Sequence, residues 1–578
     1  MAGSVKSVSS GIRPVYLCVL DGFALGQKVK GNAIYQAVKS GQAPFLAKLF
    51  AEQRCARLAC SGPAVGLPPG TMGNSEVNHM NMGAGRVVFQ SIERINVATK
   101  DGSFFTNDAL RAAVDNCRSK NSTLHLMGIL QGDNGRVHGD IEHLFSLLQM
   151  AKDADLKSVA IHLFTDGRDT NPKAAGEIYL KRLEDKIEEL GLSGIAEIKT
   201  VMGREIAMDR DTAWNKTLTA LKALVDGDGQ YRTETARDAI EASYENDQTD
   251  EFIRPTIVGN YKGISRGDSV VFWNYRQDRG IQLTMAFCES NRKTFNYKTK
   301  AKNTWDGIRL FFIKMGVKLG WLKAGKYGLI SNKDFALIQS IRQELAGLKF
   351  VAMTEYYPGL NALTAFAEGE VPETVGEVVS QAGLKQLRLA GPEKFAHVTG
   401  WFSGRRTKPF LGEDRILALD PTLKARTEEG KRYDLVPEMT AHLETEQALK
   451  AIESDKFALI VHNFQNGDMV GHTGNLDAAI AAISYISACL EKIVPTVVRQ
   501  GGAVVLTADH GNADEMILMK KGQEVPSTQH STNDVPLWVI GADVRLAETG
   551  AIPDIAPTVL QLMGLPIPES MTAKSLIV

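Results

Sequence analysis

The sequence predicts an α/β protein of two domains, and three observations support this. Short apolar runs alternate with longer amphipathic stretches, and polar or glycine-containing turns follow the runs, which is typical of parallel strands joined by helices. The chain has 578 residues, which is more than a single small module needs. Aspartate-rich turns occur toward both ends of the chain and arginine-rich turns in its middle, so we expect two domains with different roles.

Seven apolar runs are the clearest strand candidates. They cover residues 15–20, 123–127, 158–164, 269–274, 458–463, 503–508 and 535–540. Open parallel sheets bind their ligands just beyond the carboxyl ends of the strands. Five of the runs end directly in turns rich in Asp, Asn, His or Arg, so the polar residues of these turns are the first candidates for a functional site.

The simplest arrangement joins the N-terminal stretch and the C-terminal third into one domain. We expect this discontinuous domain to contain residues 1–89 and 369–578, with a second α/β domain, residues 90–368, inserted into it. Residues 292–347 fit the pattern poorly, since they carry twelve Lys and Arg against three Asp and Glu. No nucleic-acid motif surrounds this charge, so we interpret the stretch as a basic insertion at the surface.

Composition excludes several classes of protein. Lys+Arg 66 against Asp+Glu 67 leaves a formal net charge of -1, so no overall field attracts nucleic acid or an anionic membrane. The six cysteines lack the spacing of a thiolate metal site or a disulfide framework. We identify no signal peptide and no apolar run near the roughly 20 residues of a spanning helix. These features predict a cytoplasmic protein without a nucleic-acid or membrane partner.

Three aspartates and three histidines occur in turns next to predicted strands. They are Asp21, Asp468, His472, Asp509, His510 and His530. Asp468 and His472 have i, i+4 spacing, which places both side chains on one face of a helix. Each residue alone is more often a turn, cap or ordinary core residue, but the set predicts a site for two metal ions. Mixed carboxylate and imidazole ligands suit Mn²⁺, Zn²⁺ or Co²⁺ better than Ca²⁺.

Ser75 is the candidate nucleophile of this site. It follows Pro68-Pro69-Gly70 and lies at or near a predicted helix N-terminus, where backbone N–H groups favour an anion. An N-cap role would explain the serine equally well. Because a metal ion activates a serine hydroxyl and two ions brace a phosphoryl displacement, we expect Ser75 to contact the carboxylates of Asp21 and Asp509.

Four segments resemble the signatures of the cofactor-independent phosphoglycerate mutases, metal-dependent enzymes of the alkaline phosphatase superfamily. The segments are Asp21-Gly22-Phe23, Met72-Gly73-Asn74-Ser75-Glu76-Val77, Asn466-Gly467-Asp468-Met469-Val470-Gly471-His472-Thr473-Gly474 and Thr507-Ala508-Asp509-His510-Gly511-Asn512-Ala513. The resemblance recurs from Asp21 to His530 and therefore covers most of the chain. It implies an alkaline-phosphatase-like metal domain, which is discontinuous and carries an inserted substrate-binding domain.

The resemblance also implies roles for single residues. One metal ion would be held by Asp468, His472 and His530, and the other by Asp21, Ser75, Asp509 and His510, with Ser75 becoming phosphorylated. Mn²⁺ is the expected ion, with Co²⁺ or Mg²⁺ as alternatives. The residues that would bind the substrate are His138, Arg168, Asp169, Arg204, Arg210, Arg276, Arg279 and Lys394.

These substrate residues also make chemical sense. Phosphoglycerate carries a phosphate and a carboxylate, and planar guanidinium groups clamp both. His138 and Asp169 are the candidate proton carriers, because one group must act in turn as base and acid. As an alternative, Arg204 and Arg210 would only form ion pairs on a helix face with Glu205 and Asp209.

We therefore expect a monomer that interconverts 3-phosphoglycerate and 2-phosphoglycerate in glycolysis and gluconeogenesis without 2,3-bisphosphoglycerate. We expect the arginine-rich domain to close over the metal domain and exclude water. The alternatives are a metal-dependent phosphatase or phosphopentomutase on the same core, and a catalytically silent binding protein. A sulfatase is weaker, since the sequence at Cys60 lacks the Cys-x-Pro-x-Arg pattern.

Overall fold

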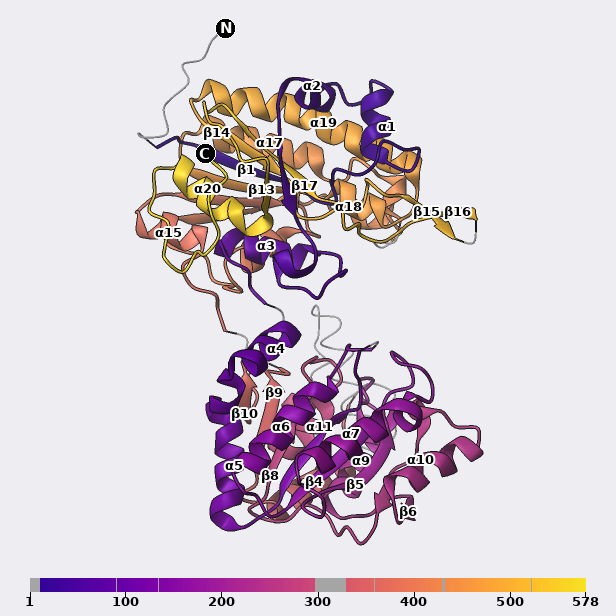
Figure 1. Cartoon of the computed structure of the whole chain (residues 1–578). Coiled ribbons are helices and arrows are strands. Elements are labelled where there is room, and N and C mark those ends of the chain that lie inside the picture. The colour runs from indigo at the N-terminus through magenta and orange to yellow at the C-terminus, as the bar shows by residue number, and fades with distance from the viewer. Residues whose placement is uncertain are drawn as a thin grey trace. The chain divides into compact units, whose positions relative to one another are not determined.

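The computed structural model describes residues 11–89, 91–133, 135–296, 329–357, 359–367, 369–428, 432–520 and 522–578. The chain divides into two compact units (Figure 1). Unit 1 contains Met1–Glu93 and Gly369–Val578, and unit 2 contains Arg94–Glu368. Most of the expected basic insertion, residues 297–328, lies outside the described residues. Its flanks form the helices α12 (Arg292–Phe295) and α14 (Asn332–Glu344).

Unit 1 is built around an eight-stranded sheet with the order β12-β11-β13-β1-β14-β17-β2-β18. β1 (Val15–Leu20) is central, with β13 (Leu459–Phe464) and β14 (Ala503–Thr507) parallel to it on either side. All six residues of β1 are buried, as expected for a strand covered on both faces. The remaining strands are β2 (Ala56–Ala59), β11 (Gln386–Ala390), β12 (Glu413–Leu417), β17 (Val535–Ile540) and β18 (Thr549–Ala551).

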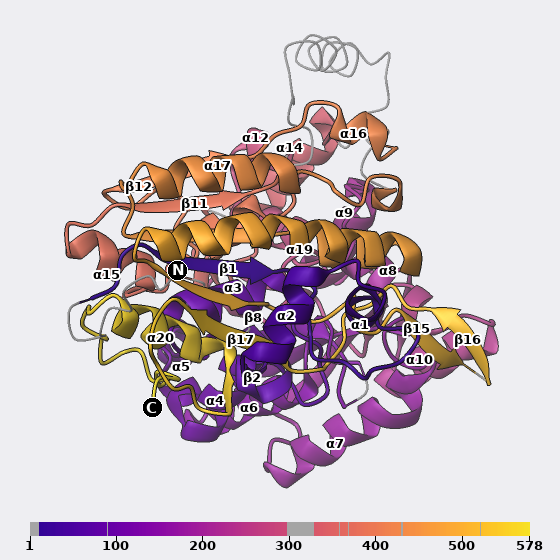
Figure 2. The same ribbon diagram turned by 90° about the horizontal axis from the view of Figure 1, so that it is seen from above.

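Helices cover both faces of this sheet (Figures 1 and 2). On one face α19 (Leu476–Arg499) packs against α1 (Ala33–Lys39), α2 (Pro44–Glu52) and α17 (Ala441–Glu453). On the other, α3 (Ser75–Ala84) packs against α20 (Ile555–Leu562) and α15 (Val375–Gln381). The shorter elements are α16 (Leu423–Arg426), α18 (Asn466–Gly471) and the hairpin of β15 (Ile517–Lys520) and β16 (Gln523–Pro526).

Within the described ranges, α19 is the one helix long and apolar enough to cross a membrane, with a mean hydropathy of 1.4 over an 18-residue stretch. Half of that stretch is buried inside the protein. Ile483, Ile486 and Leu490 belong to the hydrophobic core around the sheet. The apolar character of α19 is therefore explained by its position as a core helix.

Unit 2 contains a second eight-stranded sheet, with the order β10-β9-β8-β3-β4-β5-β7-β6. Its strands are β3 (Leu124–Ile129), β4 (Val159–Thr165), β5 (Ala196–Gly203), β6 (Tyr231–Thr233), β7 (Thr256–Val258), β8 (Ser269–Phe272), β9 (Lys349–Thr354) and β10 (Leu363–Phe366). Its other helices are α4 (Ser91–Asp101), in which the boundary between the units falls, α5 (Asp108–Lys120), α6 (Ile141–Asp153), α7 (Leu180–Glu189), α8 (Arg204–Ala207), α9 (Trp214–Val225), α10 (Ala236–Glu245) and α11 (Ile281–Cys288). α9, α11 and α14 share one hydrophobic core.

The seven predicted strands are confirmed as β1, β3, β4, β8, β13, β14 and β17, with ends that differ by at most two residues. The pattern of parallel strands joined by helices does not extend to β17, which is antiparallel to both β14 and β2. A parallel connection needs a crossover, usually a helix. The chain between β14 and β17 forms the β15–β16 hairpin instead, so it returns in the opposite direction.

Candidate active site

Polar side chains from four neighbouring parallel strands of unit 1 reach one edge of the sheet. They follow the strands β11, β13, β1 and β14, and are Lys394, Asp468, Asp21, Asp509 and His510. The carboxyl ends of parallel strands meet at the same edge. Gly22 allows this approach: its φ is +76°, and a Cβ atom there would lie 2.6 Å from the backbone nitrogen of Asp468. The turn after β1 can therefore pack directly against α18.

Ser75 is the first residue of α3, and its hydroxyl points into this group of side chains. Its Oγ lies 2.9 Å from Nε2 of His510 and 3.4 Å from Oδ1 of Asp21, and it accepts a hydrogen bond of 2.7 Å from Nζ of Lys394. The N-cap is the preceding Asn74, whose side chain accepts from the backbone N–H of Val77. The interpretation of Ser75 as the N-cap is therefore wrong, and its hydroxyl is available for chemistry.

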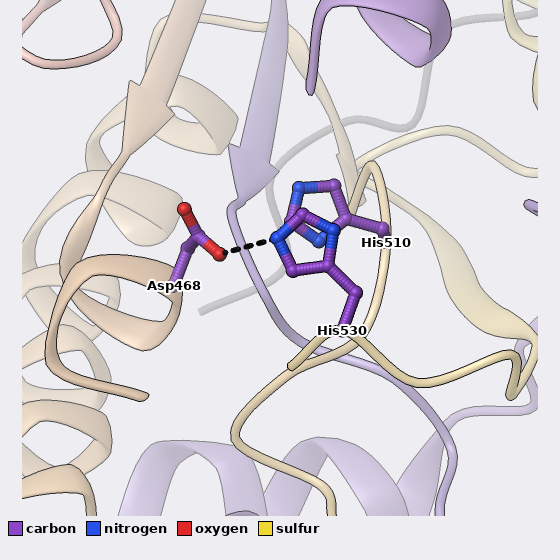
Figure 3. A group of neighbouring side chains, drawn as sticks. All are labelled: Asp468, His510 and His530. Atoms are coloured by element: carbon purple, nitrogen blue, oxygen red, sulfur yellow. Dashed lines mark ion pairs between the residues drawn. The ribbon is translucent and has the colours of Figure 1, made fainter. Parts of the chain in front are cut away.

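Three histidines present ring nitrogens to the same place. Nδ1 of His472, His510 and His530 lies 2.7 Å, 3.3 Å and 2.8 Å, respectively, from a backbone carbonyl oxygen. A neutral ring that donates from Nδ1 keeps a lone pair on Nε2, as in histidines that bind metal ions. The rings of His510 and His530 are stacked, with centroids 3.8 Å apart, and Figure 3 shows His530 directed at Asp468.

This arrangement fits a divalent metal ion. Nε2 of His472 and Nε2 of His530 are 3.1 Å apart and lie 3.1 and 3.2 Å from Oδ1 of Asp468. With both Nδ1 protons donated elsewhere, these three atoms are all acceptors, and they repel one another unless a cation lies among them. The predicted common face of Asp468 and His472 is confirmed by their contact. Lys394 also lies 2.7 Å from Asp468.

Asp509 gives a second reason to place cations here. Its carboxylate is fully buried, and Oδ2 has no hydrogen-bond partner among the described residues. Burial and the neighbouring charge of Asp21 raise the pKa of Asp509 to about 7. Oδ1 accepts from the backbone N–H of His510, but a buried carboxylate oxygen without a donor costs free energy, which a bound metal ion would remove.

Two groups of side chains each bring their ligand atoms within 4.8 Å of one another. One contains Asp468, His510 and His530, and the other Asp21, His79 and Asp509. His510 thus lies between the two expected sites, since Nε2 is also 3.4 Å from Asp509 and 3.5 Å from Asp21. His79 is an addition that the sequence did not single out.

In unit 2, Arg204 is the centre of a buried polar cluster. Its guanidinium donates to Asp166, to Oδ2 of Asp169 at 2.5 Å and to Nε2 of His138 at 2.9 Å. Burial and the positive charge of Arg204 lower the pKa of His138 to about 4. His138 is therefore neutral near pH 7, with its remaining proton on Nδ1.

A second carboxylate, Asp278, organises further arginines of this cluster. It lies 2.9 Å from Nη1 of Arg210 and 3.1 Å from Nε of Arg276, and 3.6 Å from Nδ1 of His138. The alternative of helix-face ion pairs is wrong for Arg204, because Asp166 and Asp169 are its partners.

The other two predicted arginines lie at the same end of the sheet. Arg279 donates to the backbone oxygen of Met208, and Arg168, which is half exposed, lies 3.6 Å from Glu251. Asp166 and Asp278 were missed as site residues although both stand inside the motifs that carry the arginines. Their positions next to charged residues in these motifs could have identified both aspartates as site residues.

Comparison with known proteins gives the same picture. Residues 95–315 match the family model for the N-terminus of BPG-independent PGAM. The chain is 40% identical over 571 residues to the 2,3-bisphosphoglycerate-independent phosphoglycerate mutase of Clostridium acetobutylicum, with 98% of this chain and 99% of that protein covered. It is 41% identical over 572 residues to the same enzyme of Moorella thermoacetica, with 98% of each chain covered.

A solved structure is also similar over the whole chain. Leishmania mexicana phosphoglycerate mutase, determined at low cobalt concentration, has 27% sequence identity and a TM-score of 0.55, and the match covers 98% of both chains. The resemblance seen in the sequence motifs is thereby confirmed. With 40% identity along nearly its entire length, the chain belongs to the 2,3-bisphosphoglycerate-independent phosphoglycerate mutases, isomerases that interconvert 3-phosphoglycerate and 2-phosphoglycerate.

Proposed function

We propose that Ser75 accepts the phosphoryl group from one phosphoglycerate and returns it to the other hydroxyl of the retained glycerate. The observation that carries this role is the contact of Ser75 Oγ with His510, Asp21 and Lys394 at the N-terminus of α3. Backbone N–H groups at a helix N-terminus stabilise a phosphate, and the Lys394 ammonium adds a positive charge. Ser75 thus lies among donors and charges that can bind the phosphoryl group it receives.

Two divalent ions complete this site in the proposal. Asp468, His472 and His530 would hold one ion, and Asp21, Ser75, Asp509 and His510 the other; we propose Mn²⁺, with Co²⁺ or Mg²⁺ as alternatives. When bound, such ions lower the pKa of a hydroxyl and neutralise charge on a transferring phosphoryl group. Lys394 lies between Asp21 and Asp468, so its charge faces the same phosphoryl oxygens.

The arginine cluster of unit 2 would bind the glycerate part of the substrate. Arg168, Arg204, Arg210, Arg276 and Arg279 supply the positive charge that a carboxylate and a phosphate require. Asp166, Asp169 and Asp278 hold several of these guanidinium groups in fixed positions. In this division of roles, residues 1–89 and 369–578 form the metal domain and residues 90–368 the substrate domain.

Asp169 and His138 would handle the proton of the glycerate hydroxyls. Nε2 of His138 accepts from Arg204, so this ring is held as a neutral partner that orients a hydroxyl. The side chain of Asp169 is partly exposed and lies 3.7 Å from the same nitrogen. We propose that Asp169 gives a proton to the glycerate oxygen that loses the phosphoryl group and takes one from the hydroxyl that then receives it, which is the exchange of roles that a mutase requires.

The proposal also extends to the setting of the enzyme. The described cysteines are all free thiols, which agrees with a reducing compartment. We propose a cytoplasmic monomer that acts in glycolysis and gluconeogenesis and has no nucleic-acid or membrane partner. Size-exclusion chromatography with light scattering of the metal-loaded protein would test the monomer.

The test of the function is phosphorus NMR with 3-phosphoglycerate as the substrate. The metal-loaded enzyme should form 2-phosphoglycerate without free phosphate and without added 2,3-bisphosphoglycerate. Ser75→Ala should lose this activity, while Ser119→Ala, a surface serine of unit 2, should keep it. Chelation should silence the enzyme, and Mn²⁺ should restore it. Turnover by Ser75→Ala would overturn the phosphoserine step, and free phosphate as the main product would identify a phosphatase.

A further inference from the structure

Directly behind the proposed nucleophile lies a pair of buried polar residues that the function has not used. Asn463 is the fifth residue of β13 and pairs with Val19 of β1, and His79 lies one turn after Ser75 in α3. Both side chains are fully buried. Buried polar groups are costly unless they are hydrogen-bonded, so their partners define what they do.

Asn463 joins Asp21 to His79. Its Nδ2 atom donates to Oδ2 of Asp21 at 2.8 Å and lies 3.0 Å from Nε2 of His79. The amide cannot be turned around, because Oδ1 would then face the Asp21 carboxylate with no proton between them. Both protons of this NH₂ group are therefore donated, one to each neighbour.

The orientation of Asn463 decides the tautomer of His79. Nε2 receives a proton from the amide and must offer its lone pair, so the ring proton of the neutral imidazole lies on Nδ1. Nδ1 is 2.9 Å from the backbone oxygen of Ser75, to which it donates. An unbroken chain of hydrogen bonds thus runs from the Asp21 carboxylate through Asn463 and His79 to the main chain of Ser75.

This chain fixes which oxygen of Asp21 faces the nucleophile. Asn463 holds Oδ2, and this leaves Oδ1 directed at Ser75 Oγ, Lys394 Nζ and His510 Nε2, at 3.4, 2.8 and 3.5 Å. The other end of this chain of hydrogen bonds is the contact of His79 with the backbone oxygen of Ser75. This contact holds the first turn of α3 and so positions Ser75. Both partners of the contact between Asp21 and Ser75 are therefore set by one pair of side chains.

The same hydrogen bonds argue against His79 as a metal ligand, although it lies close to Asp21 and Asp509. In the neutral ring of His79, the lone pair on Nε2 is directed at the Asn463 amide. In His510, by contrast, Nδ1 faces a backbone carbonyl and Nε2 faces Ser75 and the carboxylates. His510 can bind an ion in this state, whereas His79 would first have to lose its bond to Asn463.

We infer that Asn463 and His79 are positioning residues. They hold the Asp21 carboxylate and the first turn of α3, which contains Ser75, in the relative position that metal binding and phosphoryl transfer require. This inference rests on the proposed roles of Ser75 and Asp21. Hydrogen-bonding partners behind metal ligands typically change metal affinity or activity 10–100-fold, as an order of magnitude, when they are replaced.

The test is Mn²⁺ titration of the full-length, metal-stripped protein by isothermal calorimetry, together with kcat and KM for 3-phosphoglycerate. Asn463→Ala should weaken one of two binding events by roughly 10–100-fold and leave the other nearly unchanged. It should lower kcat more than it changes KM. Asn116→Ala removes an asparagine that is buried in unit 2 and bonded to Gly267 and Ser269, so it is the matched control for lost stability alone.

Two variants of His79 separate the two halves of the chain if Asn463→Ala folds poorly. His79→Gln can still accept from Asn463 near the Nε2 position and should keep both ions, with a reduced kcat because Ser75 is no longer held. His79→Asn can still donate to Ser75 near the Nδ1 position, but Asn463 then loses its second acceptor.

Unchanged affinity of both sites in Asn463→Ala would overturn the inference, as would an equal loss in Asn116→Ala. If His79→Ala lost an ion while Asn463→Ala did not, His79 would be a ligand and the inference would fall. Failure of the proposed function itself would be seen separately, as turnover by Ser75→Ala, and the metal titrations would not depend on it.

Discussion

At the scale of single residues, the proposed chemistry depends on which partners hold each charged side chain in place. Arg204 shows this most clearly, because one buried guanidinium contacts His138, Asp166 and Asp169. A planar fork of donors can meet several partners at once, and a lysine ammonium cannot do so in the same geometry. The charge of Arg204 alone is therefore not sufficient.

We predict that Arg204→Lys lowers kcat/KM for 3-phosphoglycerate by about 10–100-fold, because the charge stays but the fixed contacts to His138 and Asp169 are lost. The control is Arg232→Lys in the same unit, whose arginine donates to backbone oxygens of Gly227, Gly259 and Tyr261. Steady-state kinetics of both variants checks this. Equal kinetics in the two lysine variants would contradict the prediction.

Buried neutral histidines should make the protein sensitive to acid. Burial, with a smaller effect of Arg136, lowers the pKa of His143 to about 3. The unfolded chain binds a proton at this ring below pH 6.5 or so, whereas the native protein does so only near pH 3. Stability is thus lost as the pH falls through this interval, and His143 accounts for about 2 kcal/mol of that loss at pH 5.

His143→Gln removes this titration, since the amide can still donate to Asn96 but takes up no proton. We expect the melting temperature of the variant to fall less between pH 7.5 and pH 5.0 than that of the unchanged protein. Calorimetric scans at the two pH values measure this difference. An identical decrease in both proteins would assign the acid sensitivity to other groups.

Residue types and spacing in the sequence were sufficient to select Ser75 and the aspartates and histidines around it. They were not sufficient to separate a candidate nucleophile from an N-cap residue, because Asn74 and Ser75 are both good N-cap residues and only the backbone shows that Asn74 takes that position. His79 and Asn463 also escaped prediction. Their role depends on a contact between α3 and β13, and no spacing along the chain reports such a contact.

At the scale of elements, close packing of α3 against the segment after Lys394 positions Ser75, the proposed nucleophile. A Cβ atom on Gly83 of α3 would lie 1.9 Å from the backbone oxygen of Phe402. A backbone atom cannot move away as a side chain can, so a methyl group there must push the two elements apart. Ser75 belongs to α3, and Lys394 lies just before the helical segment His397–Trp401 on the other side of this contact.

Gly83→Ala should therefore destabilise the protein by about 1–3 kcal/mol and lower its activity. Gly400→Ala is the matched control, because it lies in the adjoining helical segment His397–Trp401 and a Cβ atom there meets nothing within 4 Å. We expect it to be neutral or stabilising by up to about 1 kcal/mol. Thermal melting of the two variants decides this, and similar melting temperatures would disprove the packing argument.

Element types followed from the sequence more reliably than strand directions. The apolar run of β17 looks like the runs of β1 and β14, and its burial is the same whether it is parallel or antiparallel to its neighbour. Direction depends on the connection, and the β15–β16 hairpin that sets it is half exposed and has a weak apolar pattern. For this reason the apolar run of β17 could not by itself reveal the direction of the strand.

At the scale of the whole molecule, the two units should respond differently to metal. All proposed ligands lie in unit 1, and a ligand stabilises the native state of the part that binds it. Addition of a chelator to the Mn²⁺-loaded enzyme should therefore increase hydrogen exchange at the ends of β1, β13 and β14, and change β3, β4 and β5 little. Mass spectrometry of peptides from the full-length protein measures this, and equal loss of protection in both sheets would refute it.

The central place of β1 in its sheet has a consequence for biosynthesis. The strand leaves the ribosome long before both of its neighbours, β13 and β14, because the inserted unit and much of unit 1 lie between them in the sequence. The inserted unit can fold as soon as it is complete, while an apolar strand that is entirely buried in the finished enzyme waits without partners. The nascent chain should thus need protection by chaperones around β1 until β13 and β14 emerge.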